Sequence, residues 1–167
     1  MKKKAIIISI KSYKLTKKEE KIFANENPWG LIIFKRNIKS FNQIKKLISK
    51  IRKLTNDDKF PIMIDEEGHT VTRLSKIINN DLSQKLIGDI YKSNPIIGLA
   101  IYKDYIKNLC IILNDIGINI NTVPVLDVLR KNTSKIIGTR SFSNNPYTVK
   151  KLGIACINQY DFNKIAT

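Results

Sequence analysis

The sequence predicts an α/β fold, the first half of a TIM (β/α)8 barrel with about four βα units and the start of strand five. Short runs of strand-forming apolar residues alternate with helical patterns along the chain, and such alternation indicates parallel strands joined by crossover helices. No Gly-x-Gly-x-x-Gly follows the first apolar run, which disfavours a dinucleotide-binding sheet. A complete barrel takes about 250 residues, so we expect 1–167 to form one partial barrel domain whose C-terminal half is missing.

The first two βα units are predicted within residues 5–54. Ala5–Ile10 is expected to be a buried strand, and Thr16-Lys17-Lys18-Glu19 is a capping box for a helix that runs to about Glu26. Leu31–Phe34 follows as a second buried strand. Ser40 can cap the next helix, in which apolar residues recur at intervals of three and four: Phe41, Ile44, Leu47, Ile48, Ile51 and Leu54.

The second half of the chain repeats the alternation less regularly. Residues 74–93 are weakly patterned, and we expect a long loop with a short helix there. Pro95 in a first turn and Gly117 as a C-terminal cap bound a long helix. The remaining predicted elements are strands over 61–64 and 118–121, a loop over 122–128, a helix over 146–160, and a fifth strand that begins at 164–167.

The net charge of the chain is strongly positive. Thirty Lys and Arg against fourteen Asp and Glu give a formal charge of +16 at pH 7, which raises the possibility of nucleic-acid binding. The lysines, however, are spread over every predicted helix and do not form one stripe. We therefore interpret them as a solvated surface and do not expect nucleic acid to be a partner.

The cysteines and the N-terminal residues indicate a reducing, intracellular setting. Cys110 and Cys156 lie within apolar helical patterns without ligand spacing, so we expect buried thiols and neither a metal nor another cofactor. The basic start is followed by an apolar run too short for a signal peptide. No apolar run approaches the roughly 18 residues that a membrane span needs. We expect a cytoplasmic protein with no membrane contact.

Three consecutive acids, Asp65, Glu66 and Glu67, follow the third predicted strand. Carboxylates at the end of a buried parallel strand lie where α/β folds place their ligand sites. Asp65 comes directly after the apolar run, and a buried or half-buried acid needs a partner. Glu66 and Glu67, each taken alone, are expected to be solvated loop acids.

Four motifs resemble glycoside hydrolase family 3, in the branch of bacterial β-N-acetylhexosaminidases. The segment Asp65-Glu66-Glu67-Gly68 with Val71 and Arg73 resembles the family signature Asp-Gln-Glu-Gly-Gly-Arg-Val-x-Arg. The other three matches, in the family's order and spacing, are Gly30-Leu31-Ile32-Ile33-Phe34-Lys35-Arg36-Asn37, Val123-Pro124-Val125-Leu126-Asp127-Val128 and Ile137-Gly138-Thr139-Arg140-Ser141-Phe142. The resemblance implies retaining hydrolysis of terminal β-linked N-acetylglucosamine in cell-wall recycling.

By this resemblance, Asp65, Arg73 and Arg140 bind the terminal sugar. A carboxylate can accept hydrogen bonds from vicinal hydroxyls, and guanidinium groups can donate to hydroxyl and acyl oxygens in a planar geometry. The same three side chains could also pair with one another beneath the loops, and the two roles are compatible.

The sequence departs from the family pattern in two respects. His69 and Thr70 replace a glycine and an arginine of the signature, and we interpret His69, the single histidine, as a loop substitution and not as a catalytic group. The resemblance also places the acid/base histidine after a Lys-His-Phe-Pro-Gly-His-Gly motif at strand five and the aspartate nucleophile after strand seven. Lys164–Thr167 resembles the residues just before that motif. We therefore expect no catalytic residue within this chain and an inactive, truncated form.

Three hypotheses follow from the sequence. The chain could be an enzyme fragment that a complementing C-terminal half completes. It could be a non-catalytic sugar-binding or degenerate half barrel, which would bind N-acetylglucosamine without turnover. The third and weakest is a basic nucleic-acid-binding module, for which salt-dependent binding is the test.

Overall fold

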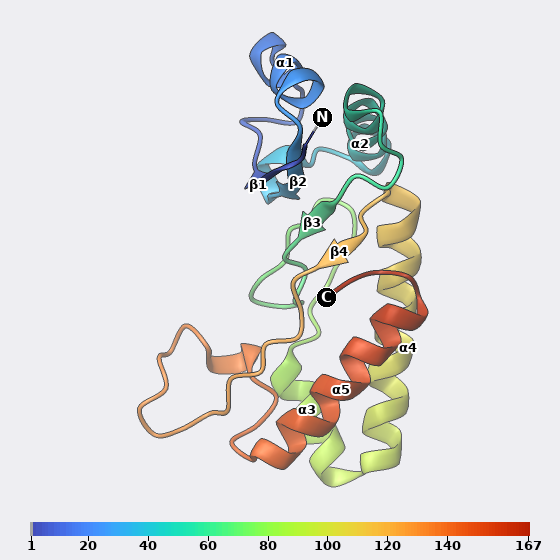
Figure 1. Ribbon diagram of the computed structural model, residues 1–167. Helices are drawn as coiled ribbons and strands as arrows, with labels where there is room; N and C mark the ends of the chain where they lie inside the picture. The colour runs from blue at the N-terminus through green and yellow to red at the C-terminus, as the bar shows by residue number, and fades with distance from the viewer. Residues whose placement is uncertain (1) are drawn as a thin grey trace.

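A computed structural model describes residues 2–167 and contains one four-stranded parallel sheet. The strands are β1 (Lys4–Ile8), β2 (Pro28–Ile33), β3 (Ile62–Ile64) and β4 (Ile120–Asn121), and they lie side by side in chain order. Figure 1 shows these strands in a row, with α2 and α4 on one side and the long loop between β4 and α5 at the lower left. The sequential parallel order is that of a barrel opened along one side, and it confirms the predicted fold class.

Strand β1 differs from the prediction. It spans Lys4–Ile8 and is largely exposed, with Ile6 and Ile7 at 51% and 41%, whereas the sequence predicted a buried strand over Ala5–Ile10. Only Ile10, after the strand, is fully buried. Within the described residues β1 pairs only with β2, so no second strand pairs with its outer edge.

The helices begin and end at the residues that the capping patterns indicated. The helices α1 (Lys17–Asn25) and α2 (Phe41–Thr55) start at the predicted caps, and the Thr16–Glu19 capping box is present. The long helix α4 (Pro95–Ile116) ends where Gly117 takes the left-handed conformation, with φ of 96°. The last helix, α5 (Pro146–Phe162), extends two residues further than predicted.

The region between β3 and α4 contains the predicted long loop and short helix. It contains α3 (Gln84–Ser93), a helix capped by the Ser83 hydroxyl and packed on α4 and α5. At the other end of the chain, Ala166 forms a parallel bridge with Ile120 of β4. This single bridge lies where the sequence predicts the start of a fifth strand.

The apolar core lies between the sheet and the helices and includes both cysteines. Cys110 and Cys156 are free and fully buried, as predicted. Burial raises the pKa of each thiol to about 12. No helix within residues 2–167 is both long and apolar enough to cross a membrane.

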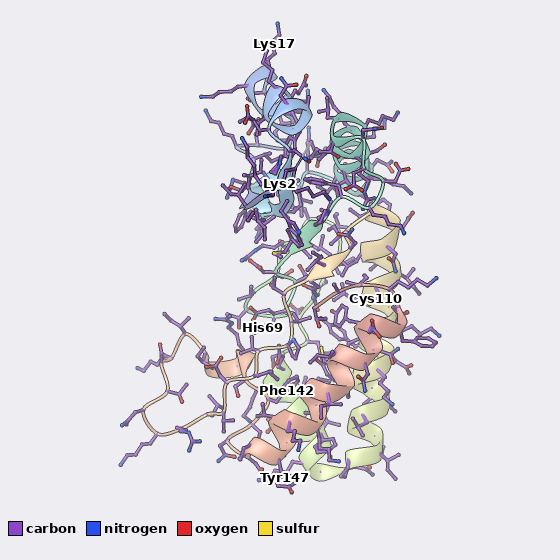
Figure 2. All side chains as sticks on the ribbon, in the orientation of Figure 1. Lys2, Lys17, His69, Cys110, Phe142 and Tyr147 are labelled. Atoms are coloured by element: carbon purple, nitrogen blue, oxygen red, sulfur yellow. The ribbon has the colours of Figure 1, made fainter. Side chains whose placement is uncertain are left out.

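Close packing fixes the loop after β4 against the helices. The Phe142 ring contacts Tyr102 of α4 edge-on, with centroids 5.5 Å apart, and Figure 2 shows Phe142 beside the helices. A Cβ atom on Gly88 would lie 1.8 Å from the Phe142 carbonyl oxygen, so only glycine allows α3 to approach this closely. The 3-10 turn η2 (Gly138–Arg140), just before Phe142, is thereby placed near the end of β3.

Candidate functional site at the carboxyl end of the sheet

The three acids after β3 differ sharply in burial. Glu66 is 1% exposed, whereas Asp65 and Glu67 are half-buried. In extended backbone, successive side chains point to opposite sides, which accounts for the burial of the middle acid alone. Asp65 and Glu67 are therefore the two acids available to the loops at this end of the sheet.

Asp65 is held between two donors. A terminal nitrogen of Arg73 lies 2.9 Å from Asp65 Oδ2, and the Thr122 hydroxyl donates to Asp65 Oδ1 at 2.6 Å. The Arg73 guanidinium carbon also lies 5.8 Å from the centroid of the Phe34 ring, which follows β2. Asp65 and Arg73 keep 21% and 25% of their side-chain surface exposed, so both remain accessible for further hydrogen bonds.

Glu67 forms a second ion pair, with Arg140. The Arg140 Nε and a terminal nitrogen donate to the two carboxylate oxygens at 2.7 and 2.8 Å, a bidentate geometry that is stronger and more directional than a single contact. The hydrogen bond with Glu67 is the main reason that the pKa of Arg140 is raised, and the charges of Asp127 and Asp65 add to it.

The structure brings the three predicted site residues to one edge of the sheet, but only two of them pair with each other. Asp65 and Arg73 pair with each other, as the sequence allowed, whereas Arg140 pairs with Glu67. The expectation that Glu66 and Glu67 are solvated is wrong. Glu66 is enclosed by hydrogen-bond donors, and the Glu67 side chain is only 9% exposed because it pairs with a cation.

A tight turn connects the acids to Arg73. Gly68 has φ of 120°, and the amides of Glu67 and Gly68 both donate to the Val71 carbonyl. His69 is exposed and donates through its backbone to Leu82, and Figure 2 shows its side chain among the loops. This position agrees with a loop substitution.

One hollow beside Arg140 is too small to hold a sugar, although 23% of the Arg140 side chain stays exposed. This hollow, lined by the turn residues and Arg140, has a volume of about 10 Å³, which is about one water. The partly exposed faces of Asp65 and Arg73 lie outside this hollow. Within residues 2–167, no cluster of three or more His, Cys, Asp or Glu side chains could hold a metal ion.

Sequence reasoning missed three polar residues that position the site. Asn121 is fully buried at the end of β4, Thr122 donates to Asp65, and Gln84 begins α3. With its amide oriented so that both polar atoms are paired, Gln84 bonds the backbone of Val125 and the Arg140 carbonyl at 3.2 Å. The available signal was a polar residue at the end of the predicted strand for Asn121 and one directly after it for Thr122.

Comparison with known proteins decides the family. The glycosyl hydrolase family 3 N-terminal domain matches residues 2–166. The chain belongs to glycoside hydrolase family 3. Two relatives are a β-hexosaminidase of Neisseria gonorrhoeae, 28% identical over 90% of this chain and 41% of that protein, and β-hexosaminidase A of Pseudoalteromonas piscicida, 30% identical over 79% of this chain and 22% of that protein.

Solved structures of family 3 members share this fold. Native NagZ of N. gonorrhoeae superposes with a TM-score of 0.88 at 25% identity, over 96% of this chain and 46% of that one. NagZ from the same organism in complex with N-trifluoroacetyl-D-glucosamine gives a TM-score of 0.86 at 25% identity. The chain thus spans less than half the length of these family 3 relatives, and its fold corresponds to part of their barrel domain.

Proposed function

We propose that Asp65, Arg73 and Arg140 form part of the wall that binds a terminal N-acetylglucosamine in a family 3 β-N-acetylhexosaminidase. The observation that carries the proposal is the Asp65–Arg73 pair, which joins an acceptor and a donor at the carboxyl end of β3 while both side chains stay partly exposed. Such a pair can accept from one sugar hydroxyl and donate to another oxygen. The N. gonorrhoeae NagZ complex with N-trifluoroacetyl-D-glucosamine supports the choice of sugar.

The completed enzyme would hydrolyse terminal β-linked N-acetylglucosamine with retention, through a glycosyl-enzyme intermediate. We assign it to cell-wall recycling in the cytoplasm, a reducing compartment that agrees with the two free, buried thiols. The chain covers 41% of the N. gonorrhoeae β-hexosaminidase and 46% of native NagZ, which supports a role for a complementing C-terminal half that would supply further walls and the catalytic groups.

Sugar binding is tested directly by ¹⁹F NMR, with N-trifluoroacetyl-D-glucosamine titrated into the 167-residue chain. We expect a saturable shift that Asp65→Ala abolishes and that Asp115→Ala, a change in an exposed ion pair between α2 and α4, leaves intact. Equal binding by the wild-type and Asp65→Ala chains would remove the assignment of Asp65.

Turnover is a separate measurement. We expect the isolated chain not to hydrolyse aryl β-N-acetylglucosaminides, because the proposal places both catalytic groups outside these residues. Sugar binding without turnover fits both a fragment awaiting its other half and a non-catalytic sugar-binding protein. Restoration of turnover by an added C-terminal half would decide for the fragment, and turnover by this chain alone that depends on Asp65 would contradict the proposal.

A further inference from the structure

The carboxylate of Glu66 is the centre of a buried polar cluster that the sugar-binding proposal does not use. Its Oε1 accepts from the Thr72 hydroxyl at 2.8 Å and from the Asn80 amide at 2.6 Å. Its Oε2 accepts from the backbone amides of Arg73 and Leu74 at 2.7 and 2.9 Å. Four donors thus surround a side chain that is 1% exposed, which offsets the cost of burying its charge.

The cluster is anchored to elements far apart in the chain. The Asn121 side chain holds the backbone of Glu66 on both sides, since its Oδ1 accepts from Glu66 N at 2.9 Å and its Nδ2 donates to Glu66 O at 3.0 Å. Asn121 Nδ2 also lies 2.9 Å from the Tyr160 hydroxyl of α5. On the other side, the Tyr105 hydroxyl of α4 donates to Asn80 Oδ1 at 2.9 Å.

Three of the four donors lie in the loop after Gly68, and those of Thr72 and Arg73 connect this cluster to the candidate site. Glu66 accepts from the residue before Arg73 and from the amide of Arg73 itself, while the Arg73 side chain reaches Asp65, the residue before Glu66. Two sets of contacts therefore hold the loop. The buried Glu66 carboxylate bonds it on the core side (the lower closure), and the Asp65–Arg73 ion pair holds it on the more exposed side. If the lower closure is lost, the backbone of Arg73 loses one of the contacts that fix its distance from Asp65.

We propose that Glu66 is a positioning residue that sets the Asp65–Arg73 pair for the sugar by folding the 66–74 loop around its buried carboxylate. The proposal deepens the proposed function and rests on it for the identity of the ligand. The effect of Glu66 on the pairing of Asp65 with Arg73 can be measured without any ligand.

Variants at Glu66 and Asn80 can be chosen that either keep or break the match between donors and acceptors in this cluster. In Glu66→Gln, the new amide can donate to Asn80 Oδ1 if the Asn80 amide turns over, and Asn80 Nδ2 can then donate to the Tyr105 oxygen. Asn80→Asp alone would set two carboxylates against each other in the core, which is strongly unfavourable. The double variant Glu66→Gln/Asn80→Asp restores complementarity, because the glutamine amide and the Tyr105 hydroxyl both donate to the new carboxylate.

Two measurements on each variant test the proposal. Arginine side-chain NMR gives separate resonances for the terminal nitrogens of Arg73 only while its pairing with Asp65 restrains guanidinium rotation, and ¹⁹F titration with N-trifluoroacetyl-D-glucosamine gives the affinity. We expect Glu66→Ala and Asn80→Asp to merge the Arg73 resonances and to weaken binding about tenfold or more, the equivalent of one lost hydrogen bond to a charged group. We expect Glu66→Gln and the double variant to stay within about threefold of wild type, a difference below about 0.7 kcal/mol.

The outcomes separate this proposal from the function on which it rests. If Glu66→Ala keeps both the restrained Arg73 resonances and the wild-type affinity while the rest of the fold is intact, Glu66 does not position the pair. Failure of the double variant to recover from Asn80→Asp would also overturn the proposal. If the wild-type chain binds no sugar, the proposed function fails, and the Arg73 resonances of the four variants still decide the role of Glu66.

Discussion

Removal of the Glu67 carboxylate is the perturbation whose effect on stability follows most directly from the structure. Glu67→Ala deletes two hydrogen bonds from the Arg140 guanidinium, of 2.7 and 2.8 Å. Hydrogen bonds to charged groups contribute about 1.5–3 kcal/mol each. Arg140 keeps 23% of its side-chain surface exposed, so water replaces part of this loss, and we expect a decrease in unfolding free energy of about 2–3 kcal/mol.

The matched control is Asp115→Ala, which removes the ion pair between Lys45 of α2 and Asp115 of α4. Both of these side chains are about half exposed, at 49% and 53%, and exposed pairs contribute about 0–1 kcal/mol. Urea unfolding followed by circular dichroism gives both values, and Glu67→Gln should fall between them because its amide oxygen can still accept one hydrogen bond. If Glu67→Ala costs no more than Asp115→Ala, the Glu67–Arg140 pair does not hold the two loops together.

Three further predictions concern the turn, the core thiols and the first helix. Gly68→Ala should lower the unfolding free energy by about 1–3 kcal/mol in the same urea experiment, since the residue has φ of 120° and its Cβ would lie 2.1 Å from the Leu82 carbonyl oxygen. The pKa of Cys110 and of Cys156 is raised to about 12 in the folded chain. Above about pH 9 the unfolded chain therefore loses protons that the folded chain keeps, and stability should fall by about 1.4 kcal/mol per pH unit for each thiol. Urea midpoints at about pH 8 and pH 10 measure this decrease, and replacement of both cysteines by alanine should make it shallower. Thr16→Ala should cost about 1 kcal/mol through loss of the N-cap, measured as a lower thermal midpoint, and an unchanged midpoint would mean that α1 does not need its capping box.

Local patterns were sufficient to predict most of the fold. The spacing of apolar residues in α2, the capping box of α1 and the Pro95 and Gly117 boundaries of α4 are short-range signals, and the structure confirms all of them. The exposure of β1 could not be predicted in this way. Its residues are apolar enough for a buried strand, but burial depends on what lies beside the strand, and within residues 2–167 only β2 does.

The candidate site was predictable only in part, for the same reason. A carboxylate directly after an apolar strand identified Asp65, and the resemblance supplied Arg73 and Arg140. Neither could reveal that Glu66 would be buried, because its carboxylate accepts from Asn80, fourteen positions away, and its backbone is held by Asn121 of another strand. Long-range hydrogen bonds of this kind leave no periodic trace in the sequence.

The unpaired edge of β1 has a consequence for how the chain behaves in solution. An apolar strand with free backbone groups is a template for pairing with a second chain, and lysines beside such an edge oppose that pairing. Here Lys3 and Lys4 precede Ile6 and Ile7, and each lysine is fixed by an acid from another segment, Asp57 and Glu26. Because these ion pairs neutralise both lysines, little free charge opposes pairing at the edge, and we expect the isolated chain to self-associate through β1.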